Sequence, residues 1–300
     1  MSSRPRSGSA EREPIVSRVS ERPSEPAISV IVPTRDRPEQ LRRCLDALAA
    51  QQFSDDVDVI VVDDGSKDPE AVAGLVKARA NARLIRLPGS GSPAARNVGV
   101  AASRAPYICF TDDDCVPDTD WLATMRRRLT EGAAVVAGRT INGLPLSALA
   151  AASQLVSNAV FELPAEPGAP SSSLACRRPV ALAVKFDEGY AGIAAEERDW
   201  YARLRKAGYE VMLEPSAAVR HIQAPSAASF LLRHVRYGRG AYRFRRAHRG
   251  ARIEAPSFYT HVIRAGFAEG VATGFAVCLA QIATTVGFVL EMLARRATRT

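Results

Sequence analysis

Between residues 28 and 114 the chain alternates short apolar runs with segments of helical periodicity, and this alternation limits the possible folds most strongly. Four apolar runs, each ended by turn residues, cover 28–34, 57–66, 82–87 and 106–114. Continuous apolar runs of this length are typical of strands buried on both faces. Strands that alternate with helices form parallel sheets with right-handed crossovers. The pattern therefore predicts an α/β fold with a mostly parallel central sheet.

Polar side chains gather where these predicted strands end. Thr34 and Arg35 end the first strand, Asp63 and Asp64 the second, and three aspartates at 112–114 the fourth. Ligands of open α/β sheets bind beyond the carboxyl ends of the strands, so we expect a binding site at this edge. For Asp63 and Asp64, a structural role in a tight turn explains the sequence equally well.

The sharpest local feature is the run Asp112-Asp113-Asp114. Three carboxylates after an apolar strand are costly to hold together unless a cation or a proton neutralises them. Mg²⁺ and Mn²⁺ bind oxygen ligands of this kind, commonly one or two carboxylates together with substrate phosphates. The alternative is a solvated acidic loop that caps the next helix, because Asp118 and Asp120 continue the run.

The second half of the chain is less regular, with helices predicted over 145–163 and 195–212 and a short strand over 211–221. Glu196 and Glu197 begin the second of these helices. Acidic residues are favoured there by the helix dipole, but either could also act as a general base toward an attacking hydroxyl. His221 ends the strand and becomes a candidate metal ligand once a metal is suspected.

The net charge of +8 is unevenly distributed. Residues 215–253 contain nine arginines and no Asp, Glu or Lys, so the rest of the chain is close to neutral. A uniformly basic nucleic-acid-binding protein is therefore disfavoured, and no known reader motif is present. On a helical wheel of 230–246, Arg236, Arg239 and Arg243 share one arc with Arg246. This pattern predicts a basic amphipathic helix on an anionic membrane surface, with a helix packed on the catalytic domain as the alternative.

Residues 271–290 carry no charge over 20 residues, which is long enough to span a bilayer. Polar residues make the segment weakly hydrophobic, and arginines follow it at 295, 296 and 299. A single crossing would put these arginines on the side opposite a cytosolic catalytic domain, against the positive-inside tendency. We therefore expect an interfacial or re-entrant helical hairpin with 257–269, or a helix buried in a dimer.

Three regions are predicted: a disordered tail over 1–26, a folded domain over 27–225, and helices over 226–300. The tail is rich in Ser, Pro, Arg and Glu and has too few large apolar residues to form a core. Five scattered cysteines form no C-x-x-C pair, which favours reduced thiols in the cytoplasm. The N-terminus lacks the apolar run of a secretory signal.

Taken together, the motifs resemble those of family 2 glycosyltransferases, in the same order along residues 27–222. The motifs are PTRDRP (33–38), VVDDGS (61–66), ARNVG (95–99), FTDDDCVP (110–117), AEERDW (195–200), AGYEV (207–211) and VRH (219–221). The resemblance implies a GT-A fold, with a Rossmann-like nucleotide-binding half and an acceptor half, followed by a C-terminal helical extension. It also implies a nucleotide-sugar donor, Mn²⁺ or Mg²⁺ as cofactor, and inversion at the anomeric carbon.

By position, the resemblance implies roles for individual residues. Nucleotide binding is implied for Pro33, Thr34, Arg35, Asp63, Asp64, Arg96, Asp112 and Asp113. Metal binding is implied for Asp112, Asp114 and His221, and the catalytic base for Glu197 with Glu196 beside it. The family usually has Gly-Glu-Asp where this chain has Ala195-Glu196-Glu197, so either glutamate could be the base.

The function expected from this resemblance is metal-dependent, inverting sugar transfer from a nucleotide-diphosphate sugar to an acceptor hydroxyl. Glycolipid, polysaccharide or cell-envelope glycan synthesis, on the inner face of the membrane, would suit such an enzyme, and the acceptor could be lipid-linked. One alternative is a non-catalytic, membrane-associated protein that binds a nucleotide or a sugar. Another is a nicotinamide-dependent oxidoreductase, which the missing glycine fingerprint after the first strand disfavours.

Overall fold

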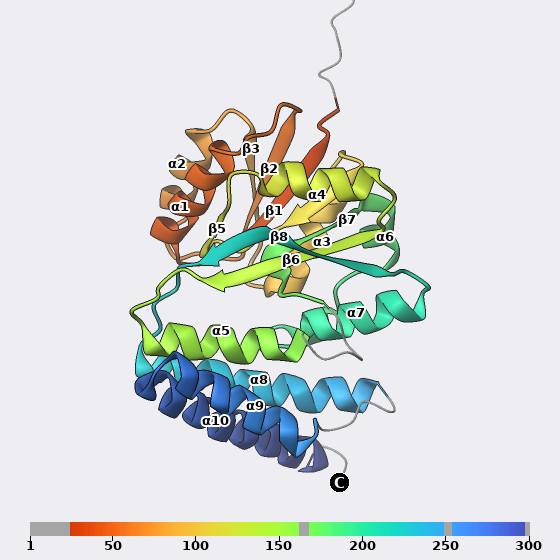
Figure 1. Ribbon diagram of the computed structural model, residues 1–300. Helices are drawn as coiled ribbons and strands as arrows, with labels where there is room; N and C mark the ends of the chain where they lie inside the picture. The colour runs from red at the N-terminus through yellow and green to blue at the C-terminus, as the bar shows by residue number, and fades with distance from the viewer. Residues whose placement is uncertain (1–24, 162–167, 249–253, 298–300) are drawn as a thin grey trace, which may run out of the picture.

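The computed structural model describes residues 25–161, 168–248 and 254–297. The tail predicted over 1–26 therefore lies almost entirely outside the described residues. One eight-stranded sheet organises the chain, with strand order β3-β2-β1-β4-β7-β6-β8-β5 (Figure 1). Its strands are β1 (Ile28–Thr34), β2 (Val57–Asp63), β3 (Ala82–Arg86), β4 (Tyr107–Phe110), β5 (Cys115–Pro117), β6 (Val135–Asn142), β7 (Leu174–Arg177) and β8 (Val211–His221).

The first half of the sheet agrees with the sequence pattern. Strands β3, β2, β1 and β4 pair in parallel, as expected for strands joined by helical crossovers. The second half is mixed, since β7 runs antiparallel to both β4 and β6 while β8 runs parallel to β6. Strand β4 ends at Phe110 rather than at residue 114, so the three aspartates lie in a turn beyond the sheet.

Helices cover both faces of the sheet, as the continuous apolar strands require. One face packs against α1 (Pro38–Ala49), α2 (Pro69–Lys77) and α4 (Trp121–Thr130), and buries Leu41 and Trp121 completely. The other face packs against α3 (Ser92–Ala102), α6 (Arg178–Ala183) and α7 (Glu196–Lys206). These two layers hold the strand ends in fixed positions for the site described below.

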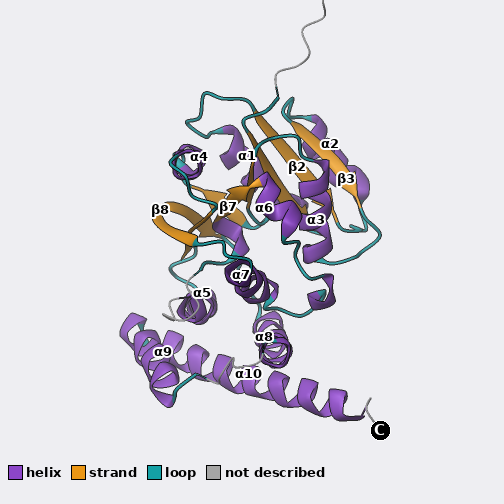
Figure 2. Ribbon diagram, turned by 90° about the vertical axis from the view of Figure 1, so that its right-hand side faces the viewer, coloured by secondary structure: helices purple, strands orange, loops and turns teal. Residues whose placement is uncertain are grey.

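A separate helical layer lies below the sheet, formed by α5 (Ala148–Phe161), α8 (Ala227–Ala247), α9 (Pro256–Glu269) and α10 (Val271–Ala297) (Figures 1 and 2). Helices α9 and α10 are consecutive and pack on each other as a helical hairpin, one of the two arrangements predicted, and its place at a membrane interface stays a prediction. Glycines bring α8 against its neighbours: a Cβ at Gly238 would lie 1.8 Å from the carbonyl oxygen of Thr284, and one at Gly240 would lie 1.9 Å from that of Ala194. The contact at Gly240 ties this layer to the loop just before Glu196.

The arginines of α8 do not form the free basic face that the helical wheel predicts. Arg239 and Arg243 form ion pairs of 2.9 and 2.6 Å with Glu291 of α10, which is 2% exposed. Arg236 lines the large cavity described below. Two of the four arginines of the arc are thus paired within the fold, because α8 lies between α10 and the catalytic layers (Figure 2), and the contact of α8 with a membrane stays a prediction.

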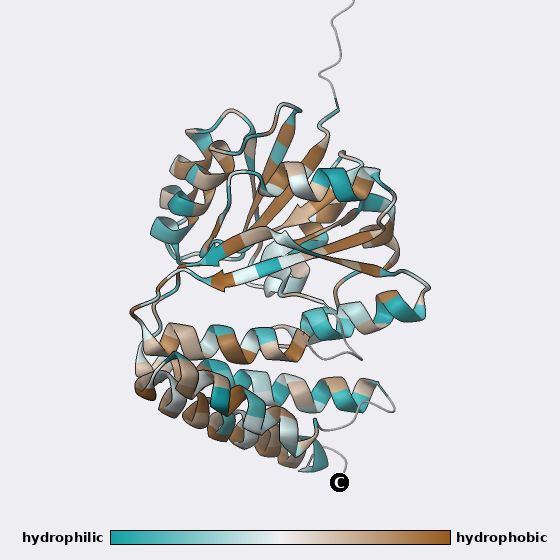
Figure 3. Cartoon of the chain, viewed as in Figure 1, coloured by the Kyte–Doolittle hydropathy of each residue, from teal (hydrophilic) through white to brown (hydrophobic). Residues whose placement is uncertain are grey.

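Most of the exposed apolar surface of this layer belongs to α10, a largely hydrophobic helix (Figure 3), while α8 adds Leu231 and Leu232 and α9 adds Phe267. The exposed apolar residues of α10 are Val271, Phe275, Leu279, Ile282, Val286, Val289, Leu290 and Leu293. They recur every three or four residues, so they form one stripe along the helix. Residues 271–296 are long and apolar enough to cross a membrane by length and composition, which is weak evidence by itself because core helices pass the same test.

Candidate active site

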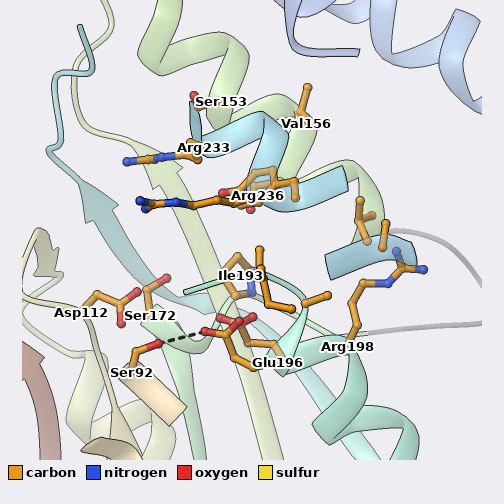
Figure 4. Close-up of a pocket in the computed structure, with 18 of the residues that line it drawn as sticks. Ser92, Asp112, Ser153, Val156, Ser172, Ile193, Glu196, Arg198, Arg233 and Arg236 are labelled. Atoms are coloured by element: carbon orange, nitrogen blue, oxygen red, sulfur yellow. Dashed lines mark hydrogen bonds between the residues drawn. The ribbon is translucent and has the colours of Figure 1, made fainter. Parts of the chain in front are cut away.

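A cavity of about 1110 Å³ lies between the carboxyl ends of the strands and the helical layer. Of the twelve residues singled out from the sequence, eleven line it; Asp63 does not. Figure 4 shows Asp112, Ser92 and Glu196 on one side of this cavity and Arg233, Arg236 and Ser153 on the other. We call these two sides the floor and the roof.

Asp113 and Asp114 are buried in the floor and share a cation. Nη1 of Arg37 lies 3.1 Å from Oδ1 of Asp113 and 3.0 Å from Oδ2 of Asp114. Asp113 also accepts a hydrogen bond of 2.8 Å from the Thr34 hydroxyl. Burial alone would raise the pKa of Asp114, but His221 and Arg37 hold it well below its usual range. The alternative of a solvated acidic loop is therefore wrong for these two carboxylates.

The donor set around Asp114 fits a hard divalent cation. Ligand atoms of Asp112, Asp114 and Cys115 all lie within 4.8 Å of one another, but burial raises the pKa of the Cys115 thiol, so it stays protonated and is a poor ligand. Pairing of β5 with β8 brings His221 beside this cluster, with Nε2 3.4 Å from Oδ2 of Asp114. Two carboxylates and one imidazole would leave room for water or phosphate oxygens on Mn²⁺ or Mg²⁺.

The two aspartates that end β2 have different surroundings. Asp64 lines the cavity and accepts hydrogen bonds of 2.6 and 2.8 Å from the backbone N–H groups of Ser90 and Gly91, which hold the loop before α3 against β2. Asp63 is completely buried and accepts a hydrogen bond from the N–H of Ser66 within its own turn. It does not line the cavity, so the structural alternative is favoured over its predicted nucleotide contact.

Arg96 links the two acidic groups of the floor. It lies in the first turns of α3, with a side chain only 4% exposed, so the alternative of an ordinary surface arginine is wrong. Its guanidinium lies 2.9 Å from Oδ1 of Asp112 and 3.4 Å from Oε1 of Glu196. A single buried cation therefore fixes the Asp112 carboxylate relative to the start of α7.

Known proteins match this chain in sequence and in fold. Residues 29–149 match the family described as glycosyl transferase family 2. The pre-mycofactocin glycosyltransferase of Mycobacterium tuberculosis is 29% identical over 231 residues, which cover 73% of this chain and 47% of that protein. Glycosyltransferase AglE of Haloferax volcanii is 37% identical over 101 residues, 32% of this chain and 33% of that protein.

The chain is therefore similar to glycosyl transferase family 2 over residues 29–149. It spans about half the length of the M. tuberculosis relative. A mannosyltransferase of Pyrobaculum calidifontis, solved with GDP-Man and Mn²⁺, aligns over 91% of this chain and 80% of its own with a TM-score of 0.58 and 19% identity. This likeness is one of fold, and it agrees with the expected GT-A architecture.

At the start of α7 the chain has Ala195-Glu196-Glu197 where the similar family usually has Gly-Glu-Asp, and this difference affects the backbone. Ala195 has φ +83°, a left-handed conformation that favours glycine. Burial and repulsion from Glu197 raise the pKa of Glu196 to about 8, despite the nearby Arg96. Glu197 instead accepts a hydrogen bond of 2.7 Å from the Ser171 hydroxyl. The two adjacent glutamates thus have distinct environments.

The sequence patterns did not indicate three residues of the site: Arg37 and Arg233 line the cavity, and Ser171 contacts Glu197. Arg37 lies within the PTRDRP motif but was not distinguished from its neighbours, although it pairs with two of the three aspartates. Ser171 precedes a strand that the sequence pattern did not predict, so nothing pointed to its contact with Glu197. Arg233 is one of nine arginines in 215–253, and nothing in the sequence distinguishes it from the others.

Proposed function

We propose that this chain transfers a sugar from a nucleotide-diphosphate sugar to an acceptor hydroxyl, with inversion, using a divalent cation. The observation that carries the proposal is the cavity floor, where Asp112, Asp114 and His221 gather a few ångströms from one another and Arg96 connects them to Glu196. The bound sugar nucleotide of the P. calidifontis neighbour supports the donor class, and its Mn²⁺ supports the cation class.

The residues near the ends of β1 and β2 suit the nucleoside. Thr34, Arg35 and Asp64 line the same end of the cavity, and Asp64 holds the 89–91 loop in place there. Asp112 and Asp114, with His221, would hold the cation, which supplies charge neutralisation for the leaving nucleoside diphosphate. Arg37 and Arg96 keep these carboxylates in place, so the floor is preorganised.

Glu197 is the residue that we assign as the base. Its carboxylate faces the cavity and is oriented by Ser171, whereas the raised pKa of Glu196 favours its neutral form. Glu197 would take the proton of the acceptor hydroxyl as the hydroxyl oxygen bonds to the anomeric carbon and the bond to the diphosphate oxygen breaks. Glu196 positions Arg96 and Ser92 through its hydrogen bonds.

We also propose that the enzyme lies on the cytoplasmic face of a membrane, through the apolar stripe of α10. The stripe is exposed along almost the whole helix, and the same helical hairpin carries two exposed arginines, Arg264 on α9 and Arg296 at the end of α10. Apolar side chains with flanking cations suit the interface of an anionic bilayer. The arginines of α8 that pair with Glu291 have no part in this contact.

The donor reaction tests this function without knowledge of the acceptor. Purified protein with Mn²⁺ should bind a nucleotide sugar from a panel of UDP, GDP and dTDP sugars and slowly release nucleoside diphosphate. Both activities should depend on the cation. Absence of binding to every sugar nucleotide in the presence of Mn²⁺ would overturn the proposal.

A further inference from the structure

The cavity roof carries two guanidinium groups that the proposed function does not use. Arg233 and Arg236 lie one turn apart on α8, and their side chains extend in the same direction over the cavity (Figure 4). Arg239 and Arg243 of the same helix have a carboxylate partner in Glu291. In the described part of the chain, neither Arg233 nor Arg236 forms an ion pair with a carboxylate.

A buried hydroxyl group faces the same space. Ser153 of α5 lines the cavity next to Arg233 and is only 4% exposed (Figure 4). Its Oγ has no hydrogen-bond partner among the described residues, which is uncommon for a buried polar atom. Two unpaired guanidinium groups and an unpaired hydroxyl, supplied by two different helices, form a donor set that suits an oxyanion.

The ion pairs of the cavity indicate which anion this is. On the floor, Arg37 pairs with Asp113 and Asp114, and Arg96 pairs with Asp112 and Glu196; a donor diphosphate would bind there through the divalent cation. The roof arginines form no such pair, although Arg233 contributes to the low pKa of Asp114, so they can bind a second anion across the cavity from the donor. We propose, on the basis of the function proposed above, that Arg233, Arg236 and Ser153 bind a phosphate group carried by the acceptor.

The surroundings of the roof add an apolar component to this acceptor. The cavity also reaches α5, α9 and α10, where Val156, Phe258 and Phe288 line it. Apolar and aromatic walls with a few convergent polar groups are typical of sites that enclose an organic ligand. The acceptor is thus an amphiphile, with a phosphate near its reacting hydroxyl and an apolar part between the helices.

Calorimetric titration of the full chain tests this site with simple probes. The protein is first saturated with Mn²⁺ and with GDP or UDP, whichever binds, and then titrated with octyl phosphate, glucose 1-phosphate or octyl glucoside. Octyl phosphate should bind most tightly. R233Q and R236Q should each weaken it by about tenfold or more, because charge-assisted hydrogen bonds to phosphate are lost. R236K should retain part of the affinity, and octyl glucoside should be insensitive to all three.

Matched controls separate this site from the donor site and from general damage. R246Q removes an exposed α8 arginine that does not line the cavity, and it should leave octyl phosphate binding unchanged. Nucleoside diphosphate affinity should stay constant in R233Q and R236Q. An equal loss of nucleoside diphosphate affinity would overturn the proposal, since the arginines would then serve the donor. No binding of octyl phosphate to the wild type would also overturn it.

The titrations also distinguish a sugar phosphate from an alkyl phosphate as the ligand. They further separate failure of the acceptor site from failure of the proposed sugar transfer. Equal affinity for glucose 1-phosphate and octyl phosphate would keep the phosphate site but overturn the apolar assignment. Failure of the proposed function would appear as absent nucleotide binding with Mn²⁺ in the wild type. The octyl phosphate titration without nucleotide would then still show whether the roof binds phosphate.

Discussion

Nη1 of Arg37 lies 3.0 Å from Oδ2 of Asp114, so a guanidinium cation contacts a carboxylate that we assign to the metal. The same nitrogen lies 3.1 Å from Asp113. Without a divalent ion, Arg37 offsets the repulsion between these two buried carboxylates. A metal that binds Asp114 must tolerate this neighbouring charge or displace it, and the affinity for metal therefore depends on Arg37.

Replacing Arg37 by Gln should tighten Mn²⁺ binding while it destabilises the metal-free protein. The affinity should rise by roughly tenfold, since a unit charge about 4 Å from a partly exposed site contributes on the order of 1–4 kcal/mol. Thermal unfolding with and without Mn²⁺ measures both effects, and the metal-induced rise in Tm should be larger in the variant. R42Q, on the exposed side of α1, is the matched control. An unchanged metal response in R37Q would show that Arg37 does not contact the metal site.

The two glutamates at the start of α7 should respond differently to replacement by Gln. Glu197→Gln should lower sugar transfer by at least about 100-fold, the usual contribution of a general base, with donor affinity retained. Glu196→Gln should have a smaller effect, because a neutral side chain at this position can still accept a hydrogen bond from Ser92. Steady-state rates and donor titrations on both variants decide the assignment, and the reverse order of losses would make Glu196 the base.

Stability should depend on pH through Glu196. Its pKa rises from 4.5 to about 8 in the folded chain, mainly because of burial and of repulsion from Glu197. Between these two values the folded state holds a proton that the unfolded chain has released, so the free energy of unfolding falls as pH increases. E196Q should remove the part of this fall in the free energy of unfolding that is due to Glu196. The substitution should therefore raise Tm near pH 8 by several degrees and have little effect near pH 4.5. As a control, E70Q, at an exposed position of α2, should leave the dependence of Tm on pH unaltered. If Tm of E196Q depends on pH in the same way as Tm of the wild type, Glu196 is not neutral in the folded chain.

Membrane binding should depend on the α10 stripe rather than on the α8 arginines. L279E and V286E place charges in the exposed stripe and should reduce sedimentation with anionic vesicles by roughly tenfold or more. R239Q should instead lower Tm, because Glu291 would lose one of the guanidinium partners that, against the effect of its burial, lower its pKa to about 2. If L279E converts a dimer into a monomer with vesicle binding intact, the stripe is a protein interface.

The parallel half of the sheet and its binding edge could be predicted from the sequence because continuous apolar runs and strand-end polar residues are local signals. The antiparallel strand β7 could not, since its four residues carry no alternation and its pairing is set by residues far away in the chain. In the site, too, only the local signals could be predicted. Asp112 and Asp114 belong to one sequence motif, whereas the ion pair of Arg37 with Asp114 and the hydrogen bond of Ser171 to Glu197 depend on tertiary contacts.

For α8, the prediction of a helix with an arc of arginines is correct, but the sequence alone does not show which of these arginines are exposed. Its helical arc of arginines is real, yet Glu291, fifty residues further along, is what neutralises Arg239 and Arg243. Only the packing of α10 against α8, allowed by Gly238 and Gly287, reveals this partner. No window of a single sequence contains that information.

The central claim is that the Asp114 carboxylate supports metal-dependent use of a nucleotide sugar, and nucleoside diphosphate release measures it most directly. The wild type with Mn²⁺ should release nucleoside diphosphate from at least one nucleotide sugar, and EDTA should abolish the release. D114N should lose both donor binding and release, whereas D118N, at the surface beside Arg220, should keep both. Release by D114N at the wild-type rate, or release that is unaffected by EDTA, would contradict the account.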